Sequence, residues 1–427
     1  MKKLLLLLLG ILFTGSLSAQ TTYLHAGNIL DVRSGKMLKQ KTIIINGKTI
    51  EKISDGFITP PDSVEVVDLR NLTLLPGLTD MHVHLENESN PQAYLHAFTF
   101  NDADNAFNSV GFAKKTLLAG FTSVRDLGGT GVNISLRDAI NQGKIDGPRI
   151  FTSGKSLATT GGHADPTNGR SKALMGDPGP KEGVVNNEDD AAKAVRQRYK
   201  NGADLIKITA TGGVLSVAKS SSNPQFTLEE IRAITKTAAD YGFHVAAHAH
   251  GDEGMQRAIK GGVKTIEHGT LMSDETMELM KEYDTYLVPT ITAGKEVSLN
   301  AEIEDYYPAM VVSKAIEIGP KIQGTFGKAY KKGVGIAFGT DAGVFKHGEN
   351  AREFGYMVEA GMPPLEAIQS ATLTPAKILH LEDQMGQVAT GFDANIIAVA
   401  GDPLQNIKTL EEVKFVMKEG KIYKNEK

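Results

Sequence analysis

The sequence predicts an α/β protein: a (β/α)8 barrel of the TIM type with a small β-sandwich domain formed from both termini. Three observations predict it. Strand and helix patterns alternate eight times in the middle of the chain, both ends are rich in short strands, and 427 residues suit one large domain with a small companion. The expected boundaries are a signal peptide at 1–19, a β-domain from 20–73 plus 385–427, and a barrel at 74–384.

The first residues have the composition of a secretory signal peptide. Basic Lys2 and Lys3 precede the apolar stretch Leu4–Phe13, and small residues follow up to Ala19. A membrane anchor is the alternative, but so short a stretch cannot cross about 30 Å of hydrocarbon. The sequence therefore predicts export to the periplasm or the medium, with cleavage after Ala19 and no membrane insertion of the mature chain.

Short strands and tight turns predict the β-domain. The stretch Thr42–Ile45 meets Asn46-Gly47, a dipeptide typical of a two-residue hairpin turn. Near the other end, Ala394–Val399 and Val413–Met417 are predicted strands. Two β-rich ends around a different middle predict one small domain built from both.

Eight short apolar segments supply the strands of the predicted barrel. In chain order they are Leu78–His84, Thr122–Asp126, Arg149–Ser153, Asp204–Thr209, His244–His248, Thr265–His268, Tyr286–Thr290 and Gly335–Gly339. The clearest helical patterns are Asp189–Lys200, Leu228–Tyr241, Gly254–Lys260 and, after the last strand, Leu365–Leu379. In such a barrel the catalytic residues lie at the carboxyl ends of the strands.

Composition narrows the chemistry. The formal net charge is −4 and no basic tract is present, so binding of nucleic acid by charge is not expected. The chain has no Cys, which excludes disulfides, cysteine-bound zinc, iron–sulfur clusters and a cysteine nucleophile. Any metal ion must therefore be held by His, Asp, Glu or a modified Lys, and the chain has 11 His.

The first and fourth strands carry ligand-type residues. His82 and His84 are two positions apart, so both imidazoles face one side of the strand and suit one metal ion. A buried structural pair is the alternative. Lys207 lies inside an apolar strand, where burial lowers the pKa of an amine. It belongs either to a buried salt bridge or to a site where its neutral amine captures carbon dioxide as a carbamate.

Three more strands end in ligand-type residues. The fifth offers His244, His248 and His250, the sixth ends in His268, and the eighth is followed by Asp341. Each has a structural alternative, such as a helix cap for the Asp. Five strands that each end in such a residue at the same rim of the barrel are rarely a coincidence, so the pattern predicts a metal site.

The order His-x-His, Lys, His, His, Asp on these strands resembles the metal-dependent amidohydrolase superfamily. The resemblance extends over nearly the whole mature chain and includes the strand-one motif Leu75–His84 and the terminal segment Gly401–Leu404. Four further motifs are similar to the imidazolonepropionase-like branch, which includes Xaa-Pro dipeptidases and carboxypeptidases that cut N-acyl amino acids. These motifs are Gly161–Asp165, His248–Gly251, Ile266–Gly269 and Gly339–Gly343.

This resemblance implies an exported hydrolase of amide bonds with two divalent metal ions, zinc being the expected metal. His82, His84 and Asp341 would hold one ion, and His248 and His268 the other. Lys207, carboxylated by carbon dioxide, would bridge them together with a hydroxide. Asp341 would take the proton of the hydroxide and pass it to the leaving nitrogen. The substrate would be a small amide or peptide.

Four other side chains are candidates for contact with the substrate. His163, in a Gly-rich loop, would donate to the developing oxyanion, unless it is only a turn residue. His250 would touch the substrate or support a ligand, and His347 would lie at the cavity mouth. Arg125 could bind a substrate carboxylate, although an internal pair with Asp126 or another carboxylate is favoured.

One departure concerns Phe226, a predicted substrate-binding position. Related dipeptidases often have a Tyr in the segment Pro224–Thr227, whose hydroxyl helps to hold the substrate carboxylate. Phe226 cannot donate that bond, so a more apolar N-acyl or aryl amide stays open.

Two other functions compete with amide hydrolysis of this kind. The first is deamination or cyclic-amide opening. Deaminases of the superfamily usually lack the strand-four Lys and have a Glu three residues after the strand-five His, so Lys207 and Gly251 favour the hydrolase. A non-enzymatic binding protein would lack ligands, and none is missing. The oligomeric state, a homo-oligomer included, is left open.

Overall fold

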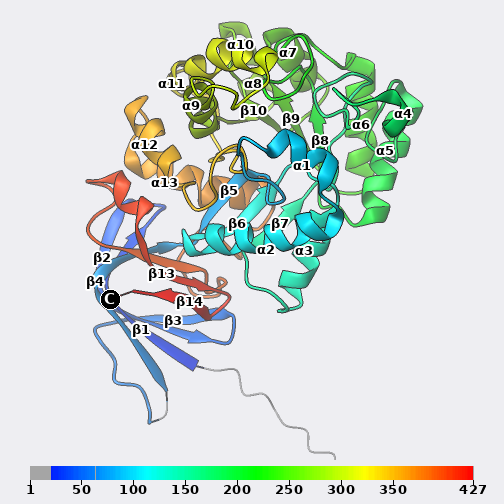
Figure 1. Ribbon diagram of the computed structural model, residues 1–427. Coiled ribbons are helices and arrows are strands. Elements are labelled where there is room, and N and C mark those ends of the chain that lie inside the picture. The colour runs from blue at the N-terminus through cyan, green and yellow to red at the C-terminus, as the bar shows by residue number, and fades with distance from the viewer. Residues whose placement is uncertain (1–20, 63, 427) are drawn as a thin grey trace, which may run out of the picture.

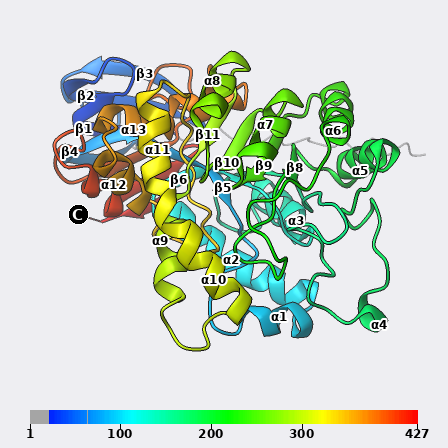
Figure 2. The same cartoon turned by 90° about the horizontal axis from the view of Figure 1, so that it is seen from above.

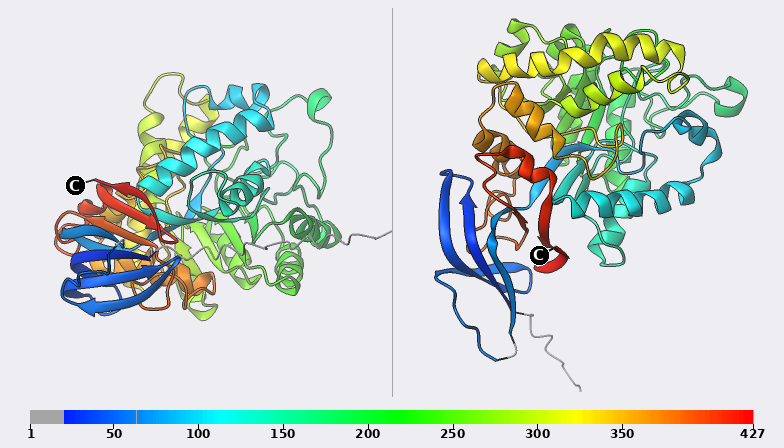
Figure 3. Two further views of the ribbon diagram at one scale, coloured as in Figure 1. Left: turned by 90° about the horizontal axis from the view of Figure 1, so that it is seen from below. Right: turned by 60° about the vertical axis from the view of Figure 1, so that its left-hand side comes forward.

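The computed structural model describes residues 21–62 and 64–426, so the predicted signal peptide at 1–19 lies outside the described residues. A β-rich part and a larger α/β part lie side by side (Figure 1). The first strands of the chain lie next to the last strands (Figure 3). Within the described residues, no helix combines the length and the apolarity needed to cross a membrane.

Strands from both ends of the chain form one sheet. They are β1 (Thr21–Asp31), β2 (Lys36–Asn46), β3 (Thr49–Asp55), β4 (Glu65–Pro76), β12 (Ile396–Val399), β13 (Val413–Lys418) and β14 (Lys421–Asn425). Their order is β14-β13-β12-β4-β1-β2-β3. The predicted hairpin is confirmed, but its two turn residues are Gly47 and Lys48, since Asn46 pairs with Thr49. Gly47, at the first turn position, has a positive φ of 58°.

The two faces of this sheet bury different residues. Ile396 and Ala398 of β12 pack with Leu24 of β1 in a core inside the β-rich part. Ile397 and Val399 alternate with them and pack into the core of the α/β part. Hydrogen bonds join all seven strands, so the predicted sandwich of two sheets is corrected to one sheet around its own core.

Seven of the eight predicted barrel strands are strands in the structure. They are β5 (Leu78–Val83), β6 (Phe121–Asp126), β7 (Arg149–Thr152), β8 (Ile206–Thr209), β9 (Val245–Ala249), β10 (Thr265–His268) and β11 (Tyr286–Val288). They form two parallel sheets, β5-β6-β7 and β8-β9-β10-β11. Leu157, after β7, forms a parallel bridge with Ile208 of β8 and so connects the two sheets.

The eighth predicted strand, Gly335–Gly339, is not a strand in the structure. Toward β11 its backbone forms one isolated bridge, between Ile336 and Leu287. Toward β5, Phe338 accepts a hydrogen bond from the backbone of Met81. The segment thus lies between β11 and β5 with too few consecutive hydrogen bonds for a ladder, and a closed eight-stranded barrel stays a prediction.

Helices follow most strands of the α/β part (Figure 2). They are α1 (Ala93–Thr99), α2 (Asp102–Leu118), α3 (Val132–Asn141), α4 (Lys172–Met175), α5 (Glu188–Asn201), α6 (Leu228–Asp240), α7 (Asp252–Lys260), α8 (Asp274–Glu282), α9 (Ile291–Asn300), α10 (Ala309–Ile318), α11 (Ile322–Lys331), α12 (Arg352–Glu359), α13 (Pro364–Ser370) and α14 (Leu373–Ile378). Helix α6 begins where the sequence predicts, because Thr227 and Glu230 form a capping box.

The helix predicted at Leu365–Leu379 is two helices, α13 and α14. Their junction is held by neighbouring backbone, since the carbonyls of Ser370 and Ala371 accept hydrogen bonds from the N–H groups of Phe338 and Thr79. Carbonyls used in this way are not available to a continuing helix.

Candidate metal centre

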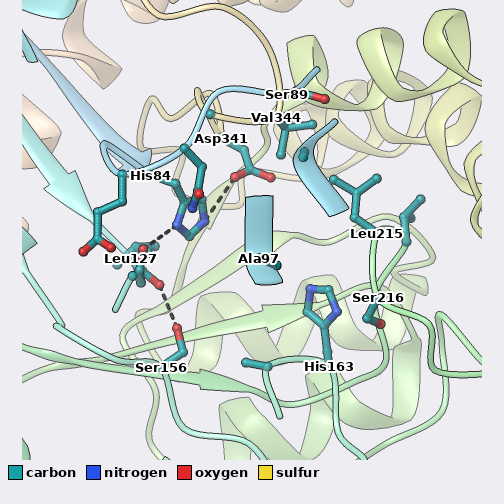
Figure 4. Close-up of a pocket in the computed structure, with 18 of the residues that line it drawn as sticks. His84, Ser89, Ala97, Leu127, Ser156, His163, Leu215, Ser216, Asp341 and Val344 are labelled. Carbon is teal, nitrogen blue, oxygen red and sulfur yellow. Dashed lines mark hydrogen bonds and ion pairs between the residues drawn. The ribbon is translucent and has the colours of Figure 1, made fainter. Parts of the chain in front are cut away.

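A cavity of about 1060 Å³ opens at the carboxyl ends of the parallel strands. One part of its wall consists of His, Asp and Lys side chains from the strand ends. Another part is apolar and includes Val214, Leu215, Val297, Ile318 and Val344. Figure 4 shows Leu215 and Val344 lining the same pocket as His84 and Asp341.

His82, His84 and Asp341 converge at the end of β5. Oδ1 of Asp341 lies 3.4 Å from Nε2 of His82 and 3.3 Å from Nε2 of His84. This oxygen is buried, and it has no partner with hydrogen-bond geometry among the described residues. Two ring nitrogens and a carboxylate oxygen that face one another in this way suit a shared cation.

Hydrogen bonds on the far side of each ring fix which nitrogen faces the cavity. Nδ1 of His82 donates to Oε2 of Glu267 at 2.9 Å, and Nδ1 of His84 donates to the carbonyl of Gly128 at 2.9 Å. Because the proton is on Nδ1, Nε2 of each ring carries the lone pair that a metal ligand needs.

A second group consists of His248, His250 and His268, whose ligand atoms lie within 4.8 Å of one another. Nε2 of His248 donates to the carbonyl of Gly212 at 3.0 Å, so its lone pair is on Nδ1. Nδ1 of His268 bonds to Thr290 Oγ1 at 2.7 Å, which leaves Nε2 of that ring for a ligand role. A group formed by His82, His268 and Asp341 meets the same criterion, so the two groups share His268.

His250 was expected to touch the substrate or to support a ligand. The structure places it in the second group, with Nδ1 bonded to Thr270 Oγ1 at 2.8 Å and its ring stacked on that of His268. His244, the first His of the fifth strand, lies outside the cavity wall and contacts Arg125 through Nε2 at 3.3 Å.

Lys207 lines the cavity from β8 and is 3% exposed. Within the described part of the chain its Nζ forms no hydrogen bond and no ion pair, so the salt bridge that was the alternative for this residue is not present there. Burial lowers the pKa of Lys207 to about 8. This lowered pKa makes the neutral amine easier to form near neutral pH than in an exposed lysine.

Burial controls the charge of the imidazoles. It lowers the pKa of His82 and of His250 to about 4, and that of His248 and His268 well below the ordinary value. These rings are therefore neutral at pH 7, as metal ligands must be.

Asp341 and His84 differ from the other groups because they face each other. Burial opposes the ionisation of Asp341, but electrostatic interaction with the imidazoles of His82 and His84 beside it lowers its pKa below the ordinary value. Burial alone would lower the pKa of His84, but the carboxylate of Asp341, 3.3 Å from Nε2, raises that pKa overall. Asp341 is therefore a carboxylate at neutral pH.

The backbone at the strand ends is unusual at three site residues. His268, Thr290 and Asp341 have φ values of 73°, 56° and 61°, in the left-handed region that residues other than Gly rarely adopt. Such conformations cluster at functional sites, where the surrounding structure holds them.

His163 lines the cavity from the Gly-rich loop, as predicted. Its ring stacks on His248 with centroids 4.4 Å apart, and its buried Nδ1 has no hydrogen-bond partner among the described residues. Gln225 accepts a hydrogen bond from its backbone N–H at 2.8 Å. The ring is thus held in the cavity wall with a polar atom unused.

Three predicted substrate contacts are not in the cavity wall. Phe226 is 1% exposed and packs in the hydrophobic core. Nε2 of His347 donates to the carbonyl of Asn87 at 2.8 Å, so this ring supports the loop after β5. Arg125 forms the internal pair that was favoured, with the carboxylate of Glu267 at 2.8 Å.

Glu267 is a site residue that the sequence did not single out. Its carboxylate accepts hydrogen bonds from His82, Arg125 and Thr265 and is completely buried. Burial alone would raise the pKa of Glu267, but Arg125 and His82 lower it to about 2. The available signal was a charged residue within a buried strand, the same signal that drew attention to Lys207.

Replacing Arg125 with Met is expected to lower the free energy of unfolding by about 3–5 kcal/mol, because it leaves the charge of Glu267 buried and unpaired. Chemical denaturation measures the loss. The control is Arg149→Met, which removes a half-buried pair with Asp393 at 3.4 Å and should cost about 1 kcal/mol or less. Equal losses in the two variants would contradict the role of Arg125.

The chain is similar to known proteins over most of its length. The amidohydrolase family model matches residues 73–423. Ochratoxinase from Aspergillus niger is 31% identical, with 95% of this chain and 87% of that protein covered. A solved Xaa-Pro dipeptidase with bound methionine in the active site is 52% identical, with a TM-score of 0.92 and coverage of 95% and 100%. A solved prolidase complexed with N-methylphosphonate-L-proline is 32% identical, with a TM-score of 0.87 and the same coverage.

Proposed function

The chain belongs to the amidohydrolase family and is a hydrolase acting on carbon–nitrogen bonds, and we propose that it uses two metal ions to hydrolyse dipeptides or N-acyl amino acids. The resemblance predicted from the sequence motifs is thereby confirmed at the level of the family and of its Xaa-Pro dipeptidase branch. Proteins of this family generally bind divalent metal ions.

One observation carries the proposal: two groups of ligand-type side chains share His268, and the buried side chain of Lys207 lines the same cavity. His82, His84 and Asp341 would hold one ion, and His248 and His268 the other. The amine of Lys207 would lose a proton and form a bond from Nζ to the carbon of carbon dioxide. The resulting carbamate supplies two oxygens to the space between the groups. His250 is a further imidazole available to the second group.

Each of the other groups at the site has its own role in the reaction. Zinc ions bound here would lower the pKa of a water molecule and polarise the scissile carbonyl. Asp341 takes a proton from the attacking water and gives it to the leaving nitrogen. His163 donates a hydrogen bond to the carbonyl oxygen as negative charge develops on it. Glu267 and the carbonyl of Gly128 hold His82 and His84 in the required tautomers.

The substrate class rests on two kinds of support. The similar proteins include a dipeptidase, a prolidase and ochratoxinase. The cavity of about 1060 Å³ is large, and part of its wall is apolar. Phe226 lies in the core, so the lack of a hydroxyl at this position leaves no unfilled polar contact in the cavity wall.

The remaining proposals concern the whole chain. We propose a closed barrel at 74–384, a β-domain from 20–73 plus 385–427, and export directed by residues 1–19. The hydrogen bonds of Gly335–Gly339 toward both β11 and β5 support closure of the barrel.

A hydrolysis screen tests the proposed function. The zinc-loaded protein is incubated with dipeptides and N-acyl amino acids, and release of free amino acid is measured. Turnover of at least one class supports the proposal. Turnover of an amino-heterocycle with no turnover of any amide would replace it with deamination.

Removal of metal is expected to abolish turnover and to lower the melting temperature, because an ion that binds only the folded state stabilises it. At a free ion concentration of 1,000 times Kd this stabilisation is about 4 kcal/mol for each site. Thermal denaturation before and after chelation, and again after addition of zinc, measures the effect. Magnesium is the control cation, since nitrogen ligands favour zinc over magnesium. An unchanged melting temperature after complete chelation would contradict a resident metal.

A further inference from the structure

Lys314 of α10 is a buried lysine that the proposed chemistry does not use. Its side chain is 5% exposed, and Nζ donates to the backbone carbonyls of Gly213 at 2.9 Å, of Ala218 at 3.0 Å and of Ser216. Among the described residues it has no carboxylate within ion-pair distance. Its ammonium therefore holds three carbonyls that lie about a hundred residues earlier in the chain.

These carbonyls belong to the loop between β8 and α6, which we call the β8–α6 loop (residues 210–227). A bridge between Thr211 and Pro224 closes the base of the loop. Val214 and Leu215, at its tip, line the cavity. The carbonyl of Leu215 accepts a hydrogen bond from the hydroxyl of Tyr94 at 2.7 Å. Among the described side chains outside the loop, this hydroxyl and the ammonium of Lys314 are the ones that donate to the carbonyls of residues 213–218.

The same loop touches the candidate metal centre. The carbonyl of Gly212 accepts the hydrogen bond that fixes the tautomer of His248. The backbone of Gly213 lies against His163 so closely that a Cβ there would be 2.2 Å from the ring. A displacement of the loop would therefore disturb both rings.

Helix α10 also packs against the loop through apolar contacts. Val214 packs in one cluster with Val297 of α9 and with Val311, Ala315 and Ile318 of α10. Val214, Val297 and Ile318 also face the cavity. This wall suits a large apolar group of the substrate, and its shape depends on where the loop lies.

Three converging carbonyl oxygens repel one another unless a cation lies between them. A lysine ammonium has three donors at one point and matches this arrangement, whereas the planar fork of an arginine does not. The ammonium of Lys314 is thus the cation that offsets the repulsion between these three carbonyls.

We propose that Lys314 is a positioning residue: its ammonium fixes the β8–α6 loop and thereby forms an apolar subsite for a large acyl or side-chain group of the substrate. The subsite rests on the proposed amide hydrolysis. The positioning of the loop does not, and it can be measured without turnover.

The test compares wild type with Lys314→Met, which keeps the length of the side chain without its charge. Hydrogen exchange of residues 211–224 should become at least about tenfold faster in the variant. With N-octanoyl and N-acetyl forms of one amino acid, kcat/KM should fall about 10- to 100-fold for the octanoyl substrate, mainly through KM, and by less than about threefold for the acetyl substrate. Lys321→Met, which removes an exposed lysine paired with Glu317 at 3.6 Å, is the control and should match wild type.

Wild-type exchange in the loop together with a wild-type ratio between the two substrates would overturn the proposal. Should Lys314→Met fail to fold, Lys314→Arg keeps the charge and is expected to show the same effects at smaller size. If the wild-type protein hydrolyses no amide at all, the proposed function fails, and hydrogen exchange alone decides whether Lys314 fixes the loop.

Discussion

Replacing Lys207 with Ala is expected to reduce kcat/KM on the order of 10³-fold or more and to lower the metal content from two ions per chain to one or none. A loss of this size corresponds to about 4 kcal/mol of transition-state stabilisation. The physical reason is the position of the amine, which lines the cavity beside both groups of ligand-type side chains. Without a carbamate there, the two groups have no shared ligand. Steady-state kinetics and elemental analysis of the same samples measure the two effects.

Rescue by added formate tests directly whether a carboxylate is needed at this position. It can place a carboxylate in the space left by the shortened side chain and should restore part of the activity of Lys207→Ala. Formate should have no such effect on Lys207→Met, whose side chain fills that space. Lys418→Ala is the control, because Lys418, in strand β13 of the β-rich part, is also buried but donates to the carbonyl of Gly147. Two bound ions and wild-type turnover in Lys207→Ala would refute the bridging role.

Replacing Asp341 with Asn is expected to reduce kcat by about 10²- to 10⁴-fold, the range that a positioned acid–base group contributes. The amide keeps the shape of the side chain but removes its charge and its capacity to accept a proton. It also places a neutral group 3.4 Å and 3.3 Å from the Nε2 atoms of His82 and His84. The fall should appear mainly in kcat, with a smaller change in KM.

The control for this variant is Asp80→Asn, at a buried Asp of β5 that bonds to Thr340 and Asn350 and does not line the cavity. Asp80→Asn is expected to lower the melting temperature more than the turnover of the folded fraction. Loss of stability without loss of turnover in Asp341→Asn would contradict its assigned role.

The sequence predicts well which strand-end residues line the cavity, because strand geometry connects spacing with direction. His82 and His84 share a face by their period of two, and parallel strands bring their carboxyl ends together. The sequence alone, without any known contact between distant segments, therefore places four residues in one cavity. They are His82, Lys207, His268 and Asp341, and all four line it.

The sequence predicts loops and side-chain partners less well, because these depend on contacts between distant segments. His347 follows the eighth segment as expected, yet a carbonyl 260 positions earlier in the chain directs its ring away from the cavity wall. Arg125 and Phe226 are drawn into the interior by Glu267 and by the apolar core. The predictions of the eighth strand and of one helix at Leu365–Leu379 are wrong for a related reason. Backbone groups that would continue these elements form hydrogen bonds with neighbouring segments instead, as between Phe338 and Ser370.

The most direct test of the two-metal amide hydrolase is a zinc titration of the metal-free protein, with release of free amino acid from its best N-acyl or dipeptide substrate as the signal. The account predicts no release without zinc and a rise that continues until about two equivalents per chain are bound. Full release from the metal-free protein, or a rise that is complete at one equivalent, would contradict it.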